Sequence, residues 1–447
     1  MIALQIFFLL LKAFILSPVS KPHSIIIKAL LNKHSYRFPA SMQTNYKAPV
    51  HYLRHVLFFI FKKKRKKNLT FGENQSIGIF DGKYDSISDR YAYLKQLETP
   101  LPGFGISRDN LKIKGFFSKV EALIGVLILT FLFTPIIILS SKRKGTISLI
   151  LLEYVEWVAL FQFLNARKCN YLYHFCAYEK DAGIIGWICS KKGIINHKVP
   201  SSNPLKNFYK NIYCDILSIT TPFQKPEIEK LSHNWRVKKI VVWPIENFQK
   251  LQPFYNVEPN SKKEFQLGFL SSGIWLRQKQ GHSPLGTGDQ ESELALLEIL
   301  KEFLSKNRSI SFIVLLHPIE KKSIEVYEEA CNHYRNLFDG INLYFGNKEK
   351  SSYEYFSVTD TTIAAYSSTN LQRLFCGYKT LYAPLKFQTK LYEHSDIEKI
   401  IALDKNSLFE LLYTTLKLSE KDFFNYNNLM EYHFFAYQSL TNKSLIV

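Results

Sequence analysis

Three short polar clusters in the second half of the chain each follow a run of mainly apolar residues. They are Ser271-Ser272-Gly273, His317-Pro318 and Ser367-Ser368-Thr369. Each apolar run predicts a buried strand, and the carboxyl ends of parallel strands meet at one edge of a sheet, where ligands bind. We therefore expect the three clusters to gather around one ligand.

The Ser367-Ser368-Thr369 cluster precedes a predicted helix. Short hydroxyl side chains and free backbone N–H groups at a helix start suit a phosphate, because the helix dipole favours negative charge there. A simple N-cap also selects Ser or Thr at this position, so a structural interpretation stands beside the phosphate site. Ser271, Ser272 and Gly273 form an earlier strand-to-helix turn, where glycine lets the backbone approach a ligand closely.

His317 follows a buried run and precedes Pro318, which cannot continue a ladder of backbone hydrogen bonds. The imidazole is therefore expected at the edge of the sheet. A histidine there can donate a hydrogen bond to a phosphate oxygen and, when protonated, offset charge on a nucleotide leaving group. A purely structural histidine is the alternative.

The elements that would position these residues alternate between strand and helix in both halves of the chain. Strands are predicted over 76–80, 170–176, 215–220, 265–270, 311–316 and 361–366, and helices over 147–164, 181–191 and 291–304. The polar, proline-containing stretch 246–263 predicts a linker between two domains. This alternation is typical of parallel sheets, so we predict an α/β protein of two Rossmann-like domains.

The His-Pro pair after one strand and the Ser-Ser pair after a later one resemble motifs of bacterial sialyltransferases and polysialyltransferases. The resemblance implies the two-domain glycosyltransferase fold called GT-B, whose domains face each other across a cleft. It also implies that His317 contacts the phosphate of a CMP-activated sugar and assists its departure, while Ser367 and Ser368 bind the same phosphate. The motifs lie within residues 265–380, and related His-Pro enzymes that transfer Kdo share much of the pattern.

Enzymes of these families also carry an acidic-acidic-Gly motif, whose carboxylate deprotonates the acceptor hydroxyl. The present sequence departs from that motif; the nearest stretches are Glu179-Lys180-Asp181-Ala182-Gly183 and Asp81-Gly82. We predict Asp181 as the general base, with Glu179 second and Asp81 third, since all follow a predicted strand. Favourable acids at a helix N-terminus are the structural alternative.

Six cysteines occur without a CxxC pair and without histidines at metal-ligand spacing. This pattern favours a reducing, cytosolic compartment and no structural zinc. No DxD motif has a suitable place, so we expect a metal-independent displacement at the anomeric carbon, with inversion and with no cofactor besides the CMP-activated donor substrate.

The formal net charge of +20 favours an anionic partner. Nucleic acid is not expected, because the basic residues are dispersed or adjoin apolar segments and no nucleic-acid-binding motif is present.

The apolar segment 56–61 runs into the basic run Lys62–Lys67, which is typical of attachment to anionic lipid, although a solvated charge run is the alternative. Residues 122–139 carry no charge and could span a membrane, lie in its surface or be buried in a core.

The chain is thus predicted to comprise four regions. These are an apolar and basic membrane-associating region (1–70), an acceptor domain (71–250), a nucleotide-sugar domain (260–400) and a helical tail (401–447). The resemblance implies transfer of a sialic-acid-like nonulosonic sugar to a saccharide or glycolipid acceptor in bacterial capsule, lipooligosaccharide or O-antigen synthesis. The protein is then expected at the cytoplasmic face of the inner membrane, as a peripheral or monotopic protein. A GT-B transferase for CMP-Kdo or a UDP- or GDP-hexose, and a noncatalytic membrane scaffold, are the alternatives.

Overall fold

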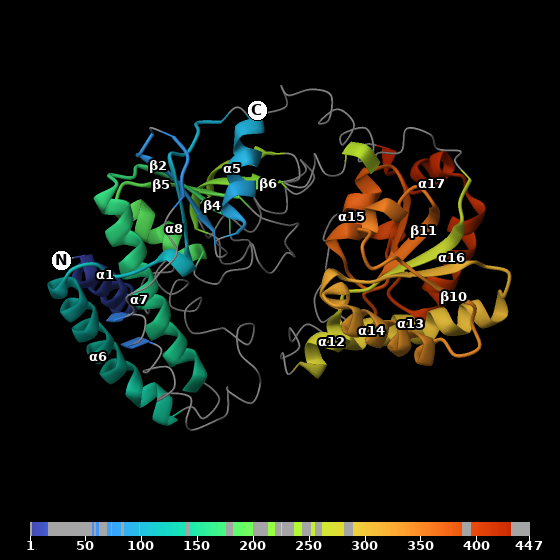
Figure 1. Ribbon diagram of the computed structural model, residues 1–447, viewed down its shortest axis with the longest axis horizontal. Helices are drawn as coiled ribbons and strands as arrows, with labels where there is room; N and C mark the ends of the chain where they lie inside the picture. Colours follow the sequence, from blue (N-terminus) through green and yellow to red (C-terminus); the bar gives the residue numbers. More distant parts are fainter. Residues whose placement is uncertain are drawn as a thin grey trace. The chain divides into compact units, whose positions relative to one another are not determined.

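The computed structural model of the chain divides into two compact α/β units, Met1–Trp243 and Pro244–Leu445 (Figure 1). The structure describes residues 2–16, 56–57, 60–61, 69–72, 74–81, 85–97, 99–139, 144–175, 182–199, 213–219, 225, 237–243, 252–254, 262–280, 289–386 and 395–430. The division between the units falls near the start of the predicted linker, most of which lies outside the described residues.

Among its described residues, the first unit is built on a sheet of seven strands, all parallel except for the pair β1 and β3. The strands are β1 (Leu69–Thr70), β2 (Ile77–Asp81), β3 (Phe104–Ser107), β4 (Tyr171–Phe175), β5 (Ile195–Lys198), β6 (Cys214–Ile219) and β7 (Val237–Val242). Their order across the sheet is β1-β3-β2-β4-β5-β6-β7. From β2 the next strand along the chain, β3, is added on one side of the sheet, whereas β4 to β7 are added one after another on the other side. The boundary between β2 and β4 is therefore a topological switch point.

Helices of the first unit extend the core beyond the sheet. They are α1 (Ile2–Leu16), α5 (Ile87–Gln96), α6 (Phe116–Leu139), α7 (Lys144–Ala166) and α8 (Ala182–Lys191), with the 3-10 turn η2 (Arg108–Asn110). The hydroxyl of Tyr154 on α7 donates a hydrogen bond to the carbonyl of Ala3 on α1, at 2.9 Å. A Cβ at Gly125 of α6 would lie 2.2 Å from the same hydroxyl oxygen, so glycine is needed where these helices approach each other.

The apolar segments near the N-terminus are part of this packing. Ala3, Ile6, Phe7 and Leu10 of α1 are buried in one cluster with residues of α6 and α7. Within the part of the chain that the structure describes, no helix has the length and apolar character needed to cross a membrane.

The described part of the second unit is built on a parallel sheet of five strands. These are β8 (Phe265–Leu270), β9 (Phe312–Leu315), β10 (Leu343–Phe345), β11 (Thr359–Ala364) and β12 (Lys379–Tyr382). The order across the sheet is β10-β9-β8-β11-β12, so the switch point lies between β8 and β11. Leu267, Phe269 and Phe312 to Leu315 are buried in the sheet, as expected of strands covered on both faces.

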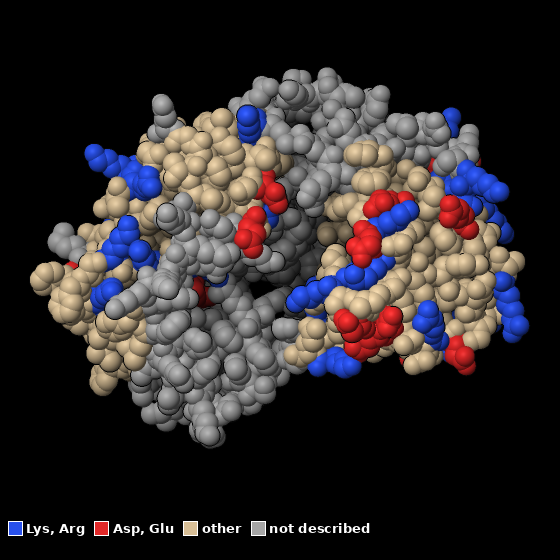
Figure 2. Space-filling model, in the orientation of Figure 1, with Lys and Arg blue, Asp and Glu red and all other residues tan. Residues whose placement is uncertain are grey.

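Helices cover both faces of the second sheet, and in Figure 1 α13 and α14 lie on one side while α15 and α17 lie on the other. The helices are α12 (Ile274–Lys279), α13 (Asp289–Lys306), α14 (Ile324–Leu337), α15 (Ser368–Phe375), α16 (Lys405–Lys417) and α17 (Glu420–Tyr426), with 3-10 turns η4 (Gln252–Phe254), η5 (Pro318–Lys321), η6 (Ser352–Tyr355) and η7 (Ser395–Ile400). On the face drawn in Figure 2, acidic and basic side chains are interspersed over the described atoms of this unit.

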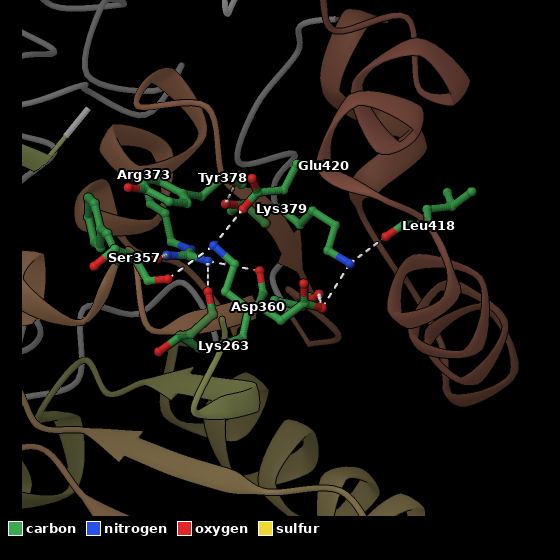
Figure 3. Close-up of polar contacts among 12 residues, drawn as sticks. Lys263, Ser357, Asp360, Arg373, Tyr378, Lys379, Leu418 and Glu420 are labelled. Carbon is green, nitrogen blue, oxygen red and sulfur yellow. Dashed lines mark hydrogen bonds and ion pairs between the residues drawn. The ribbon is translucent and has the colours of Figure 1, made fainter. Parts of the chain in front are cut away.

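A buried ionic cluster lies at the amino edge of the second sheet, where β11 and β12 begin (Figure 3). The guanidinium of Arg373 donates to the carbonyls of Phe356, Thr359 and Asp360, and burial lowers its pKa to about 10. The ammonium of Lys379 lies 2.8 Å from the Asp360 carboxylate and donates to two carbonyls at the end of α16. These contacts anchor the helices that follow the sheet.

The sequence-predicted elements agree closely with the observed ones, with one displacement. The predicted strands 76–80, 170–176, 215–220, 265–270 and 311–316 correspond to β2, β4, β6, β8 and β9. The strand predicted over 361–366 instead covers Thr359–Ala364, because its threonines pair within the sheet and Ser367 already caps the next helix. The expectation of an α/β protein with two largely parallel sheets is confirmed.

Candidate functional site

The three polar clusters of the second unit follow three neighbouring strands. His317 comes two residues after β9, Ser271 directly follows β8, and Ser367 comes three residues after β11. These strands are adjacent and parallel in the order β9-β8-β11. The clusters therefore share the carboxyl edge of the sheet, beside its switch point, which is where open α/β sheets bind ligands.

The Ser271–Gly273 turn packs directly against His317. The Ser271 backbone N–H donates to the Leu315 carbonyl at 3.1 Å, which ties the turn to the neighbouring strand. Gly273 has a φ of +64°, and a Cβ at this position would lie 3.2 Å from the Cβ of His317 and 2.6 Å from a methyl carbon of Ile319. Only glycine tolerates both the left-handed backbone and this close approach.

The two serine hydroxyls of this turn already have partners within the protein. Ser271 Oγ lies 2.7 Å from the hydroxyl of Tyr334 and accepts a hydrogen bond from the Gly273 N–H. Ser272 donates through both its N–H and its hydroxyl to the buried carboxylate of Glu293. Burial raises the pKa of Glu293 to about 7, and the nearby Glu320 adds to the increase. These bonds hold the turn in shape, and a ligand contact by the two hydroxyls stays a prediction.

His317 is held in one tautomer by its own backbone. The N–H of Ile319 donates to Nδ1 at 3.2 Å, so in the neutral ring the proton is carried by Nε2. Burial, together with the charges of Arg277 and Lys321, lowers the pKa of His317 to about 4. The ring is therefore neutral near pH 7 in the unliganded protein, and it offers an Nε2–H donor rather than the positive charge that we had considered from the sequence.

Glu320 organises the surroundings of His317, a role that was not predicted from the sequence. Its fully buried carboxylate accepts hydrogen bonds from the His317 backbone N–H at 2.7 Å, the Trp275 indole N–H and the Tyr334 hydroxyl. Burial raises its pKa. The spacing of the cap residue His317 and the acid three positions later is that of a capping box, and this signal could have identified the residue.

Ser367 is the N-cap of α15, as the structural interpretation of the sequence anticipated. Its hydroxyl accepts from the N–H of Asn370, and its carbonyl accepts from the Tyr382 hydroxyl at 3.1 Å. Ser368 and Thr369 are half-buried in the first turn. Within the described residues no acceptor is found for their backbone N–H groups, so two oriented donors remain at the positive end of the helix.

Two basic side chains add positive potential beside His317. The charges of Arg277 on α12 and Lys321 on η5 both lower the pKa of the imidazole, in addition to the larger effect of burial. The Lys321 ammonium donates to the carbonyl of Lys350. Among the described residues, the Arg277 guanidinium has no hydrogen bond or ion pair, whereas the Arg277 backbone N–H donates to the Gly273 carbonyl at 3.2 Å. Together with the Nε2–H and the α15 donors, these charges suit an anionic ligand group.

The carboxyl edge of the first sheet carries the third candidate for the general base. Asp81 ends β2 and is paired in register with Phe175, the last residue of β4, so it flanks the switch point of that sheet. Its carboxylate forms an ion pair with Arg90 at 2.8 Å. Glu179 and Asp181 come four and six residues after the end of β4 in the sequence and lie outside the described residues.

Comparisons with known proteins give only distant similarities. Neither a protein-family model nor a curated protein sequence matches the chain. The similar solved structures include the UDP-GlcNAc 2-epimerase of Methanocaldococcus jannaschii in complex with UDP-GlcNAc and UDP (11% identity, 81% of this chain and 99% of that one, TM-score 0.43). They also include MurG of Acinetobacter baumannii (11% identity, 83% and 91%, TM-score 0.33) and the wall teichoic acid polymerase TagF (11% identity, 89% and 98%, TM-score 0.36). Similarities this low assign neither a fold family nor an activity to the chain.

Proposed function

We propose that the chain is an inverting glycosyltransferase of the GT-B type that uses a CMP-activated nonulosonic sugar. One observation carries the proposal. The Nε2–H donor of His317 and the unsatisfied N–H groups at the start of α15 follow strands on either side of β8, at a switch-point edge with Arg277 nearby. This set of donors is what a leaving phosphate group requires.

In the proposed reaction an acceptor hydroxyl attacks the anomeric carbon of the donor sugar. The bond from that carbon to the phosphate oxygen breaks, and CMP leaves with the electron pair. His317 and α15 stabilise the charge that develops on the phosphate, while a carboxylate of the first unit takes the proton of the acceptor hydroxyl. A bound phosphate would also raise the pKa of His317, since an adjacent negative charge favours the protonated ring.

We propose Asp181 as the base, followed by Glu179 and then Asp81. The support is that Asp81 ends β2 and the other two residues follow β4 in the sequence, and these two strands flank the switch point of the first sheet. Asp81 ranks last because Arg90 already binds its carboxylate. The resemblance to sialyltransferases further supports a saccharide or glycolipid acceptor of a bacterial surface polysaccharide, at the cytoplasmic face of the inner membrane.

Alternative donors would use the same edge of the sheet. Retaining GT-B enzymes usually carry a glutamate shortly after the phosphate loop, where this chain has Gln372 and Arg373. Gln372 accepts from the Tyr353 hydroxyl at 3.0 Å, and Arg373 belongs to the buried ionic cluster. Both side chains therefore serve the fold, which favours an inverting reaction over a retaining one.

A donor panel tests this function. The full chain is incubated with CMP-N-acetylneuraminate, CMP-legionaminate, CMP-pseudaminate, CMP-Kdo and UDP-GlcNAc, and the released nucleotide is separated by chromatography. We expect CMP from a nonulosonic donor, and we expect Arg277→Gln to raise KM while the matched surface variant Arg335→Gln does not. CMP from CMP-Kdo alone would select the Kdo alternative, release of UDP would overturn the donor assignment, and no release from any donor would favour the scaffold.

A further inference from the structure

One face of α6 exposes a continuous set of large apolar side chains. We call this set the apolar face of α6; its members are Phe116, Phe117, Val120, Ile124, Leu127, Ile128 and Phe131. Phe116, Phe117 and Phe131 are 74%, 82% and 79% exposed. Isolated apolar residues on a surface are ordinary, but a contiguous patch of this kind marks an interaction site.

The other face of the same helix is already used for packing within the unit. Ala122, Val126 and Leu129 are buried in the cluster that contains α1 and α7. The helix is therefore held in place by one side while its second apolar side remains exposed. In Figure 2, the described surface around α6 is mainly uncharged, with some basic side chains close by.

Basic residues surround the beginning of this face. Lys112 and Lys114 are exposed just before the helix starts. The ammonium of Lys119 lies 5.8 Å from the ring centre of Phe61, a half-exposed residue that immediately precedes the basic run Lys62–Lys67 in the sequence. The contact places Phe61 beside Lys119 of α6.

We propose that the apolar face of α6 lies in the interfacial region of a bilayer that contains anionic lipid. Phenylalanines enter the boundary between head groups and acyl chains, while the lysines beside them meet the negative surface. A second copy of the chain is a poorer occupant, because it would bring the same basic residues against their equivalents in a protein of net charge +20. The inference specifies the surface for the proposed membrane location and does not depend on the transferase chemistry.

Vesicle co-sedimentation of the full chain tests this surface. Vesicles of phosphatidylcholine alone are compared with vesicles that also contain phosphatidylglycerol. We expect binding to the anionic vesicles, and a loss of at least about tenfold in the partition coefficient for the double variant Phe117→Ser/Phe131→Ser. The matched control Ile324→Ser/Leu403→Ser removes two exposed apolar side chains from the second unit and should bind like the wild type.

A second variant keeps the test valid if the double variant fails to fold. Lys112→Gln/Lys114→Gln should weaken binding to the anionic vesicles and make it less sensitive to salt. Unchanged binding by both variants, or no binding by the wild type, would overturn the inference. Lipid-free self-association that Phe117→Ser/Phe131→Ser abolishes would instead identify a second copy as the occupant. Donor cleavage in lipid-free solution separates the two proposals, because failure there leaves the membrane surface standing and defeats only the transferase.

Discussion

The two edges of the second sheet both carry polar residues, but they use them differently. At the amino edge, Arg373 and Lys379 are buried, and each of these charged groups has a partner within the protein. At the carboxyl edge, His317 Nε2, the guanidinium of Arg277 and the first N–H groups of α15 have no hydrogen-bond partner among the described residues. Polar groups satisfied within the fold stabilise it, whereas oriented donors left over at a sheet edge are available to a ligand.

Removal of His317 should have the largest effect on activity and little effect on the fold. We expect His317→Ala to lower donor cleavage by about 100- to 10,000-fold, because the leaving phosphate loses its hydrogen-bond donor. Steady-state assays with saturating donor and a chemical denaturation curve measure both properties. His317→Gln keeps a neutral donor and should retain part of the activity; equal activity of wild type and His317→Ala would make the histidine structural.

Lys379, at the opposite edge, should show the reverse behaviour. Lys379→Met leaves Asp360 without its cation and two carbonyls at the end of α16 without a donor. Loss of one member of a buried pair costs about 3 kcal/mol or more, so denaturation should begin at much lower urea concentration. Lys417→Met, at an exposed position on α16, is the control. A stable Lys379→Met protein would contradict the structural role of the amino-edge cluster.

The buried Glu293 should make stability depend on pH. Its folded pKa of about 7 exceeds its ordinary value of 4.5, so the folded state binds the proton more tightly than the unfolded chain does. The corresponding stabilisation is complete below pH 4.5 and is lost as the pH rises through 7. We expect a loss of about 2 kcal/mol between mildly acidic and neutral pH, measured by urea unfolding. Glu293→Gln should flatten this dependence, and an equally steep profile in that variant would assign it to another group.

Several strands of the fold could be predicted from the sequence because their residues are buried on both faces. Phe265–Leu270 was predicted to the residue, and 311–316 differed from β9 by one residue at each end. β12 and α14 were not predicted, since the polar Lys379 and Thr380 obscure the short strand and charged residues fill much of the helix. The Lys379 ammonium can be buried within a strand only because it forms an ion pair with Asp360 and donates a hydrogen bond to a carbonyl at the end of α16. Both partners are distant from Lys379 in the sequence.

The sequence by itself determined which loops meet at the carboxyl edge, because polar residues placed just after apolar runs must lie at strand ends in a parallel sheet. Only the tertiary structure decided which of those residues remain available. Ser271 is bound by Tyr334 and Ser272 by Glu293, while Ile319 directs the His317 proton to Nε2. The hydroxyl partners are 63 and 21 positions away in the chain. Hydrogen bonds of that kind depend on how helices pack on the sheet, which the local residue pattern does not encode.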